Sequence, residues 1–142
     1  MELGLVNREQ ADLLKKLGFD WETYYCYWVS DHYPNTLRSF QSRCVHENFF
    51  GDYKHLDNFN NNEDFVSVPT VALALKWCRD VKGVVGTIEF SFDFTFYYSV
   101  KLLNYVPGKG EASKLGGGFT NYEQAESGLL DEVLDILSEN LV

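Results

Sequence analysis

A glycine-rich stretch near the C-terminus carries the most suggestive chemistry in the chain. Residues 107–118, PGKGEASKLGGG, combine flexible backbone with two lysines, Lys109 and Lys114, and a predicted helix begins directly afterwards at Thr120 or Asn121. Backbone N–H groups, a helix N-terminus and ammonium groups can together hold a phosphate or another anion. The Gly-x4-Gly-Lys-Ser/Thr spacing of a Walker A loop is absent. The stretch therefore predicts either an anion site of another kind or a plain flexible connection.

Carboxylates dominate the last predicted helix. Six of them, and no lysine or arginine, lie between residues 121 and 142. Asp131, Asp135 and Glu139 recur every fourth residue, so they share one side of a helix. This row is either an ordinary solvated face or an acidic surface that docks on a basic partner or mimics DNA.

Cysteine and histidine offer weaker signals for a metal site or a catalytic site. Cys44, His46 and His55 could supply zinc ligands, but no CxxC or HxxxH spacing accompanies them. Cys44 or Cys26 could pair with His46 as nucleophile and base, which requires a spatial proximity that sequence does not show. We therefore expect no metal, no cofactor and no assignable catalytic residue, and a protein that binds rather than catalyses.

Composition and charge exclude several classes of protein. The chain has 142 residues, of which 45% are hydrophobic and 16% aromatic, so it can bury a core as a single domain spanning 1–142. A net charge of −9 argues against general nucleic-acid binding, which needs a basic footprint. No apolar run approaches the roughly 20 residues that span a bilayer. The N-terminus lacks the pattern of a signal peptide, so we expect a cytoplasmic protein without membrane contact.

The best-specified element that must position these residues is a central helix ending at Gly83. Pro69 suits a first helical position, and Ser67 is the predicted cap because its hydroxyl can accept from an unpaired N–H of the first turn. One apolar stripe follows at helical spacing: Val71, Ala74, Leu75, Cys78 and Val81. Gly83 can adopt the left-handed conformation that ends a helix.

The other predicted elements surround this helix. Asn7 and Gln10 form a capping box before a short helix over residues 8–17. The predicted strands and loops are an aromatic strand over 21–29, a strand or irregular segment over 36–50, an exposed loop over 51–64, and a hairpin over 84–92 and 94–105 that turns near Asp93. Gly128 weakens the last helix unless another group packs closely against it. These elements predict an α+β fold: an antiparallel sheet of three to five strands with about three helices packed mainly on one face.

Three stretches together resemble a loose group of small phage and prophage proteins of gut bacteria. They are LLKKLGFDWETYY, VPTVALALKWCRDVKG and TNYEQAESGLLDEVLDIL. Cys78 stands where a leucine would be expected in this pattern. The resemblance implies a phage-encoded accessory protein of the host cytoplasm, of a kind that inhibits host defences by binding a host protein or a small nucleotide.

The sequence thus leads to an expectation of function by binding. For a protein partner, the contact would be exposed aromatic residues together with the row Asp131, Asp135 and Glu139. For a nucleotide, Lys109, Lys114 and the cap at Thr120 or Asn121 would hold phosphate, and an aromatic side chain would stack on the base. The alternatives are a small cysteine- or histidine-dependent enzyme and a structural or assembly component, and a homo-oligomer stays open.

Overall fold

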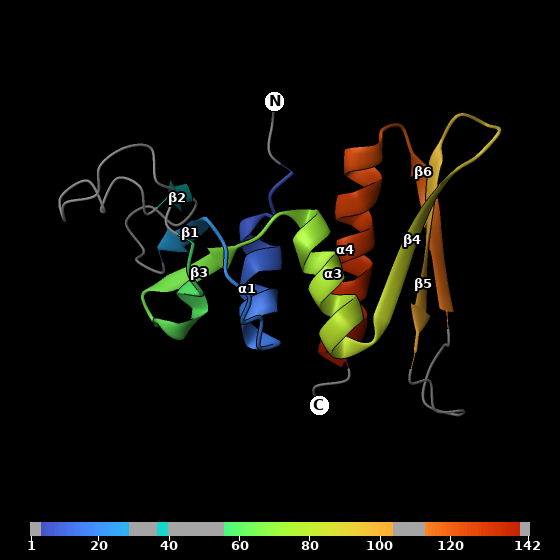
Figure 1. Cartoon of the computed structure of the whole chain (residues 1–142). Coiled ribbons are helices and arrows are strands. Elements are labelled where there is room, and N and C mark those ends of the chain that lie inside the picture. The colour runs from blue at the N-terminus through green and yellow to red at the C-terminus, as the bar shows by residue number, and fades with distance from the viewer. Residues whose placement is uncertain (1–3, 29–36, 40–55, 104–112, 140–142) are drawn as a thin grey trace. The chain divides into compact units, whose positions relative to one another are not determined.

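The computed structural model describes residues 4–28, 37–39, 56–103 and 113–139. The chain divides into two compact units: the N-terminal unit, Leu5–Pro69, and the C-terminal unit, Thr70–Val142 with Met1–Gly4 (Figure 1). Three α-helices and two antiparallel sheets among the described residues confirm the predicted α+β class. That residues 1–142 form one domain, with the helices mainly on one face, stays a prediction, and each unit is described by itself.

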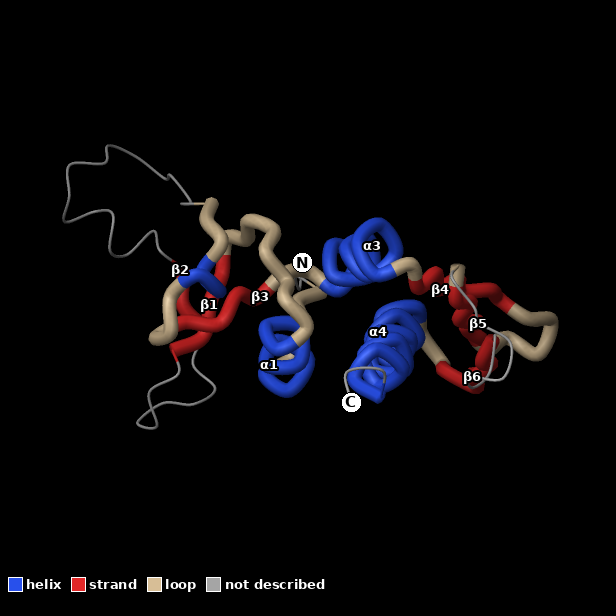
Figure 2. Tube along the Cα trace, turned by 90° about the horizontal axis from the view of Figure 1, so that it is seen from below, coloured by secondary structure: helices blue, strands red, loops and turns tan. Residues whose placement is uncertain are grey.

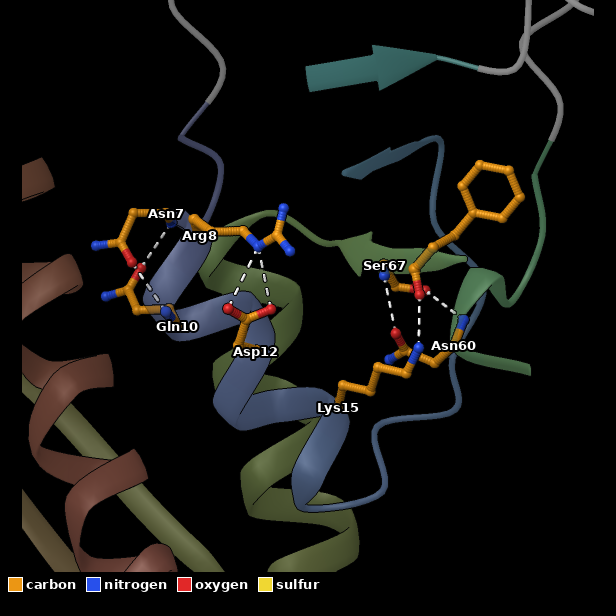
Figure 3. Close-up of polar contacts among 8 residues, drawn as sticks. Asn7, Arg8, Gln10, Asp12, Lys15, Asn60 and Ser67 are labelled. Atoms are coloured by element: carbon orange, nitrogen blue, oxygen red, sulfur yellow. Dashed lines mark hydrogen bonds and ion pairs between the residues drawn. The ribbon is translucent and has the colours of Figure 1, made fainter. Parts of the chain in front are cut away.

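The N-terminal unit begins with the predicted capping box. Asn7 Oδ1 accepts a 2.9 Å hydrogen bond from the Gln10 N–H, and Gln10 Oε1 accepts a 3.0 Å bond from the Asn7 N–H (Figure 3). Two N–H groups that the helix itself cannot satisfy thereby gain partners. Helix α1 follows over Arg8–Lys16, as predicted.

A small sheet completes the N-terminal unit. Its strands are β1 (Tyr25–Trp28), β2 (Leu37–Ser39) and β3 (Phe65–Val68), paired in the order β2-β1-β3. The predicted aromatic strand is confirmed at β1, but it is shorter than the expected range 21–29. The predicted loop over 51–64 is wrong at Phe59, which begins a 3₁₀ helix, η2 (Phe59–Asn61), and is buried beside Cys26 and Phe65. The asparagines of this segment had suggested an exposed loop, but burial of the Phe59 ring holds the segment against the rest of the unit.

Ser67 lies in β3, so its prediction as a helix cap is wrong. Its N–H donates a 2.8 Å hydrogen bond to Asn60 Oδ1, and its Oγ accepts a 3.2 Å bond from the Asn60 N–H (Figure 3). The ammonium group of Lys15 donates to the carbonyl oxygens of Asn62 at 3.0 Å and Phe65 at 2.6 Å, which ties α1 to the start of β3. These polar contacts satisfy groups inside the fold and have a structural role.

In the C-terminal unit, Thr70 caps the central helix α3 (Val71–Lys82). Its Oγ1 accepts a 3.1 Å hydrogen bond from the Leu73 N–H, and Gly83 ends the helix with a φ of 71° as predicted. Both Ser67 and Thr70 carry a hydroxyl that could cap a helix. Because the helix begins after Pro69, only Thr70 lies three residues before an N–H group of the first turn.

The larger sheet of the C-terminal unit has the order β4-β5-β6. Its strands are β4 (Val84–Phe90), β5 (Phe96–Leu102) and β6 (Ser113–Phe119). The predicted hairpin is confirmed, with Val84 opposite Leu102 and Phe90 opposite Phe96. The predicted glycine-rich loop is wrong over residues 113–118, which lie in β6. Residues 113–117 pair with β5, and the register shifts at Gly118. Tyr97 and Tyr98 stand opposite Gly117 and Gly116, and their rings cover the strand where glycine offers no side chain.

Helix α4 (Tyr122–Glu139) packs on this sheet, with buried Leu129 against Gly86 of β4. Figures 1 and 2 show α3 and α4 on the same face of the β4-β5-β6 sheet. The expected close packing at Gly128 is confirmed, because a Cβ there would stand 2.6 Å from Cζ of Phe119. The face of the sheet that Val85, Thr87 and Tyr97 share is the one opposite α4.

Candidate functional site

The turn between β4 and β5 holds a non-glycine residue in the left-handed region. The Ser91 N–H donates a 2.9 Å hydrogen bond to the Thr95 carbonyl oxygen, and the Phe94 N–H donates a 3.0 Å bond to the Ser91 carbonyl oxygen. Phe94 has a φ of 64° and is the one non-glycine residue with a positive φ in the described ranges. This conformation costs a bulky side chain roughly 1–2 kcal/mol, which indicates that the turn has a role beyond joining two strands.

The Asp93 carboxylate organises this turn. Oδ1 accepts hydrogen bonds from the hydroxyl of Thr95 at 2.7 Å and from its N–H at 3.2 Å, and Oδ2 accepts a 2.7 Å bond from the Tyr97 hydroxyl. These bonds, from Thr95 first and Tyr97 second, hold the pKa of Asp93 below its ordinary value. An ionised carboxylate therefore fixes the turn at neutral pH.

The turn displays aromatic rings to solvent. The side chains of Phe90, Phe92 and Phe94 are 59%, 96% and 78% exposed, and Tyr122 at the start of α4 is 47% exposed. The ring of Phe90 adjoins two others, with centroid distances of 6.3 Å to Phe94 and 4.9 Å to Phe96. Phe96 meets Tyr122 edge to face at 6.0 Å. We call these five residues the aromatic tip.

The charge around the aromatic tip is negative. The segments that build it, residues 84–100 and 119–139, contain no lysine or arginine. Burial raises the pKa of the Tyr122 phenol, and Glu126 and then Glu123 raise it further, so both carboxylates lie close to that ring. The pKa of Glu126 is also raised, mainly by burial and further by the charge of Glu123. The tip is thus an apolar surface beside carboxylates.

The predicted anion-binding residues that the structure describes do not come together. Lys114 lies near the start of β6 and forms a 3.4 Å ion pair with Glu132, whereas Thr120 and Asn121 follow the end of that strand. The five residues from Lys114 to Phe119 place the lysine roughly 17 Å from the end of β6 at the usual rise per residue. Asn121 Oδ1 accepts a 2.8 Å hydrogen bond from the Gln124 N–H and so caps α4. Lys109 lies outside the described residues.

The predicted acidic row is present and faces solvent. Asp131, Asp135 and Glu139 are all exposed on α4. The charges of Glu132, Asp131 and Asp135, after burial as the main cause, raise the pKa of the Tyr98 phenol. These carboxylates therefore lie on the side of α4 that adjoins β5 and β6.

The residues proposed for cysteine or histidine chemistry give no assembled site. Cys26 and Cys78 are fully buried, and burial raises the pKa of the Cys78 thiol to about 12. Cys44, His46 and His55 lie outside the described residues. Among the residues with described positions, no group of three or more histidine, cysteine or acidic side chains could hold a metal ion.

Sequence reasoning did not single out the aromatic tip. The signal was present in residues 90–96, FSFDFTF, where phenylalanine occupies every second position through the turn itself. Hairpin turns favour polar residues and glycine, so apolar residues at the turn mark a departure from ordinary turn chemistry. Alternation had predicted only a hairpin of two strands that turns near Asp93.

No helix in the described parts of the chain is both long and apolar enough to cross a lipid bilayer. Comparison of the chain with protein-family models, with curated proteins and with solved structures finds no match in any of the three. The aromatic tip and the charges around it are the features from which a function can be inferred.

Proposed function

We propose that this chain acts by binding another protein through the aromatic tip. The observation that carries the proposal is the exposure of Phe90, Phe92 and Phe94 at one turn, each by more than half of its side-chain surface. Clustered apolar side chains on a surface are unfavourable in water unless a partner covers them, and aromatic residues dominate the energetics of interfaces.

The turn is built to present these rings at low entropic cost. Three hydrogen bonds to Asp93 and the 2.9 Å bond from Ser91 to Thr95 restrain the backbone before any partner arrives. A pre-ordered loop loses less conformational freedom on binding, which increases affinity. The unfavourable φ of Phe94 fits the same interpretation, because it keeps a third ring outside the sheet.

The charges around the tip favour one kind of partner. Glu123 and Glu126 lie beside Tyr122, and no lysine or arginine occurs in the segments that build the tip. We infer a protein partner whose apolar pocket is bordered by lysine or arginine, because complementary charges increase the rate of encounter and select among partners. A nucleotide is less well supported, since Lys114 is paired with Glu132 and lies far from the cap of α4. The resemblance to phage proteins makes a host protein the expected source of this partner.

The experiment places the photo-crosslinking residue p-benzoylphenylalanine at position 92 in one sample and at position 81 in another. Val81 is the matched control, since it is an exposed apolar residue of the same unit that lies on α3. Irradiation in cells that naturally contain the chain, followed by mass spectrometry of crosslinked peptides, identifies a partner. We expect crosslinks from position 92 and none to that partner from position 81.

Binding of the purified partner is then measured by calorimetry with Phe92→Ser and Val81→Ala. We expect the first substitution to weaken binding by about tenfold or more, because a central interface ring contributes at least about 1.4 kcal/mol. The second should leave affinity unchanged. Equal crosslinking at both positions, or wild-type affinity in Phe92→Ser, would overturn the proposal.

A further inference from the structure

Strand β6 presents a sheet edge. Among the described residues β6 pairs with β5 alone, so its backbone N–H and C=O groups on the other side have no strand beside them. Such an edge is a template for another extended segment, and natural proteins commonly shorten it, charge it or cover it. Here the strand runs over Ser113–Phe119, with regular pairing from Ser113 to Gly117 before the register shifts at Gly118. Leu115 is 83% exposed.

Two tyrosine rings extend from β5 across this edge strand, one on each face. A Cβ on Gly116 would stand 2.3 Å from Cζ of Tyr98, and a Cβ on Gly117 would stand 1.9 Å from Cδ1 of Tyr97. Tyr98 faces α4 and Tyr97 faces the opposite side, because successive side chains of a strand alternate. A strand added beside β6 would therefore lie next to glycines that aromatic rings cover on both faces of the sheet.

The face of the sheet toward α4 is negatively charged at this edge. Lys114 and Glu132 form a 3.4 Å ion pair, which places that side of α4 against β6. Asp135 stands three residues further along the helix, on the same side, and is exposed. The charge of Asp135 also acts on Tyr98. The pKa of Tyr98 is raised mainly by burial and further by the charges of Glu132, Asp131 and Asp135. Side chains of an added segment on this face would lie in a negative electrostatic potential, which favours cations.

We propose that the edge of β6 accepts an extended segment of a partner as a fourth strand, and that the side chains of this segment facing α4 are lysine or arginine. Main-chain hydrogen bonds to β6 would supply affinity, and alternate basic side chains beside Asp135 would supply specificity. The edge of β6 adjoins the aromatic tip where Phe119 pairs with Phe96. The inference rests on the backbone of β6 and on the charge of Asp135, so it does not depend on the function proposed above. A second copy of the chain is a poorer occupant, because each copy carries a net charge of −9.

The test titrates the full chain with short synthetic peptides and measures affinity by fluorescence anisotropy. The first peptide alternates lysine with threonine, the second replaces each lysine by glutamate, and the third is the lysine peptide with N-methylated backbone along one edge. We expect binding of the first alone, because the second has the wrong charge and the third cannot donate hydrogen bonds to β6. Equal affinity of the first and third peptides would show that charge alone attracts them, and would overturn strand addition.

Variants of the chain localise the binding. Asp135→Lys should weaken binding of the lysine peptide by about fivefold, the size of one favourable surface ion pair. Phe92→Ser is the matched control and should bind the peptide as wild type, whatever it does to the partner of the aromatic tip. Amide hydrogen exchange should slow in β6 when the peptide binds.

Three results contradict the inference: no binding of the lysine peptide, unchanged affinity in Asp135→Lys, or exchange protection that appears elsewhere but not in β6. Sedimentation of the chain without peptide tests whether a second copy of the chain occupies the edge of β6. A mass that doubles with concentration, together with slowed exchange in β6, would assign the edge to a second copy and would also overturn the proposal.

Discussion

The Tyr97 hydroxyl donates a 2.7 Å hydrogen bond to Asp93 Oδ2, which joins the first residues of β5 to the turn that precedes them. The other oxygen of the same carboxylate accepts two bonds from Thr95. The ring that covers Gly117 on the sheet therefore also restrains the aromatic tip. The ionised form of this exposed aspartate strengthens the turn, because hydrogen bonds to a charged acceptor are stronger than bonds to a neutral one.

Acid should loosen the turn in a defined pH window. The pKa of Asp93 is lower in the folded chain than the 3.8 of an unperturbed aspartate, so its contribution to stability is present above that value. This contribution is lost as the pH falls through the lowered pKa. The amide resonance of Thr95, followed by NMR, should titrate with a midpoint below 3.8, and Asp93→Asn should abolish this titration. A midpoint at or above 3.8 would contradict the assigned hydrogen bonds.

Replacing Phe94 should separate stability from binding. Asparagine tolerates a positive φ better than phenylalanine does, so Phe94→Asn should raise the free energy of unfolding by about 0.5–1 kcal/mol in urea denaturation. The same change removes an exposed ring of the tip and should weaken binding to the partner. Phe92→Asn is the control, since it removes a ring from a position without positive φ and should weaken binding with no gain in stability. A Phe94→Asn variant that is less stable than wild type would contradict backbone strain at position 94.

Local sequence patterns predicted the elements that depend on neighbouring residues. The capping box of Asn7 and Gln10, the left-handed Gly83 and the hairpin of β4 with β5 all follow from spacings of a few residues. Such features are set by backbone hydrogen bonds and alternation within one short segment, which a sequence displays directly.

The errors arose where a distant residue decides the local structure. Residues 113–118 have glycines that predict a loop, yet Tyr97 and Tyr98 from the neighbouring strand supply the packing that keeps them in β6. Ser67 carries the chemistry of a cap, but it pairs with Cys26 of β1 in the sheet and also bonds to Asn60. The candidate site was missed in the same way, because exposure of phenylalanine at a turn is a property of the folded sheet. The acidic row on α4 was predicted correctly as an exposed face, since helical spacing alone decides it.

Gly128→Ala tests the packing of α4 on β6. In an isolated helix the substitution is favourable by about 1 kcal/mol, but here the new Cβ would stand 2.6 Å from Cζ of Phe119. Overpacking of this kind costs about 1–3 kcal/mol, so thermal or urea unfolding should show a net loss of stability. The double variant with Phe119→Leu should recover part of the loss, because the shorter side chain leaves room for the methyl group. A Gly128→Ala single variant that is more stable than wild type would mean that the Phe119 ring can move aside without loss of stability.

The Cys78 thiol should be unreactive while the chain is folded. It is fully buried, and burial raises its pKa to about 12, an effect that the charge of Lys82 only partly offsets. Since the thiolate is the reactive form, the folded chain should hold Cys78 almost entirely as the unreactive thiol at pH 8.

Iodoacetamide labelling followed by peptide mass spectrometry should therefore leave Cys78 unmodified in buffer and modify it fully in urea. The urea sample is the control that shows the peptide to be detectable. Rapid modification of Cys78 in the folded chain would contradict its burial, and it would restore a cysteine-dependent activity of the C-terminal unit as a competing explanation of function.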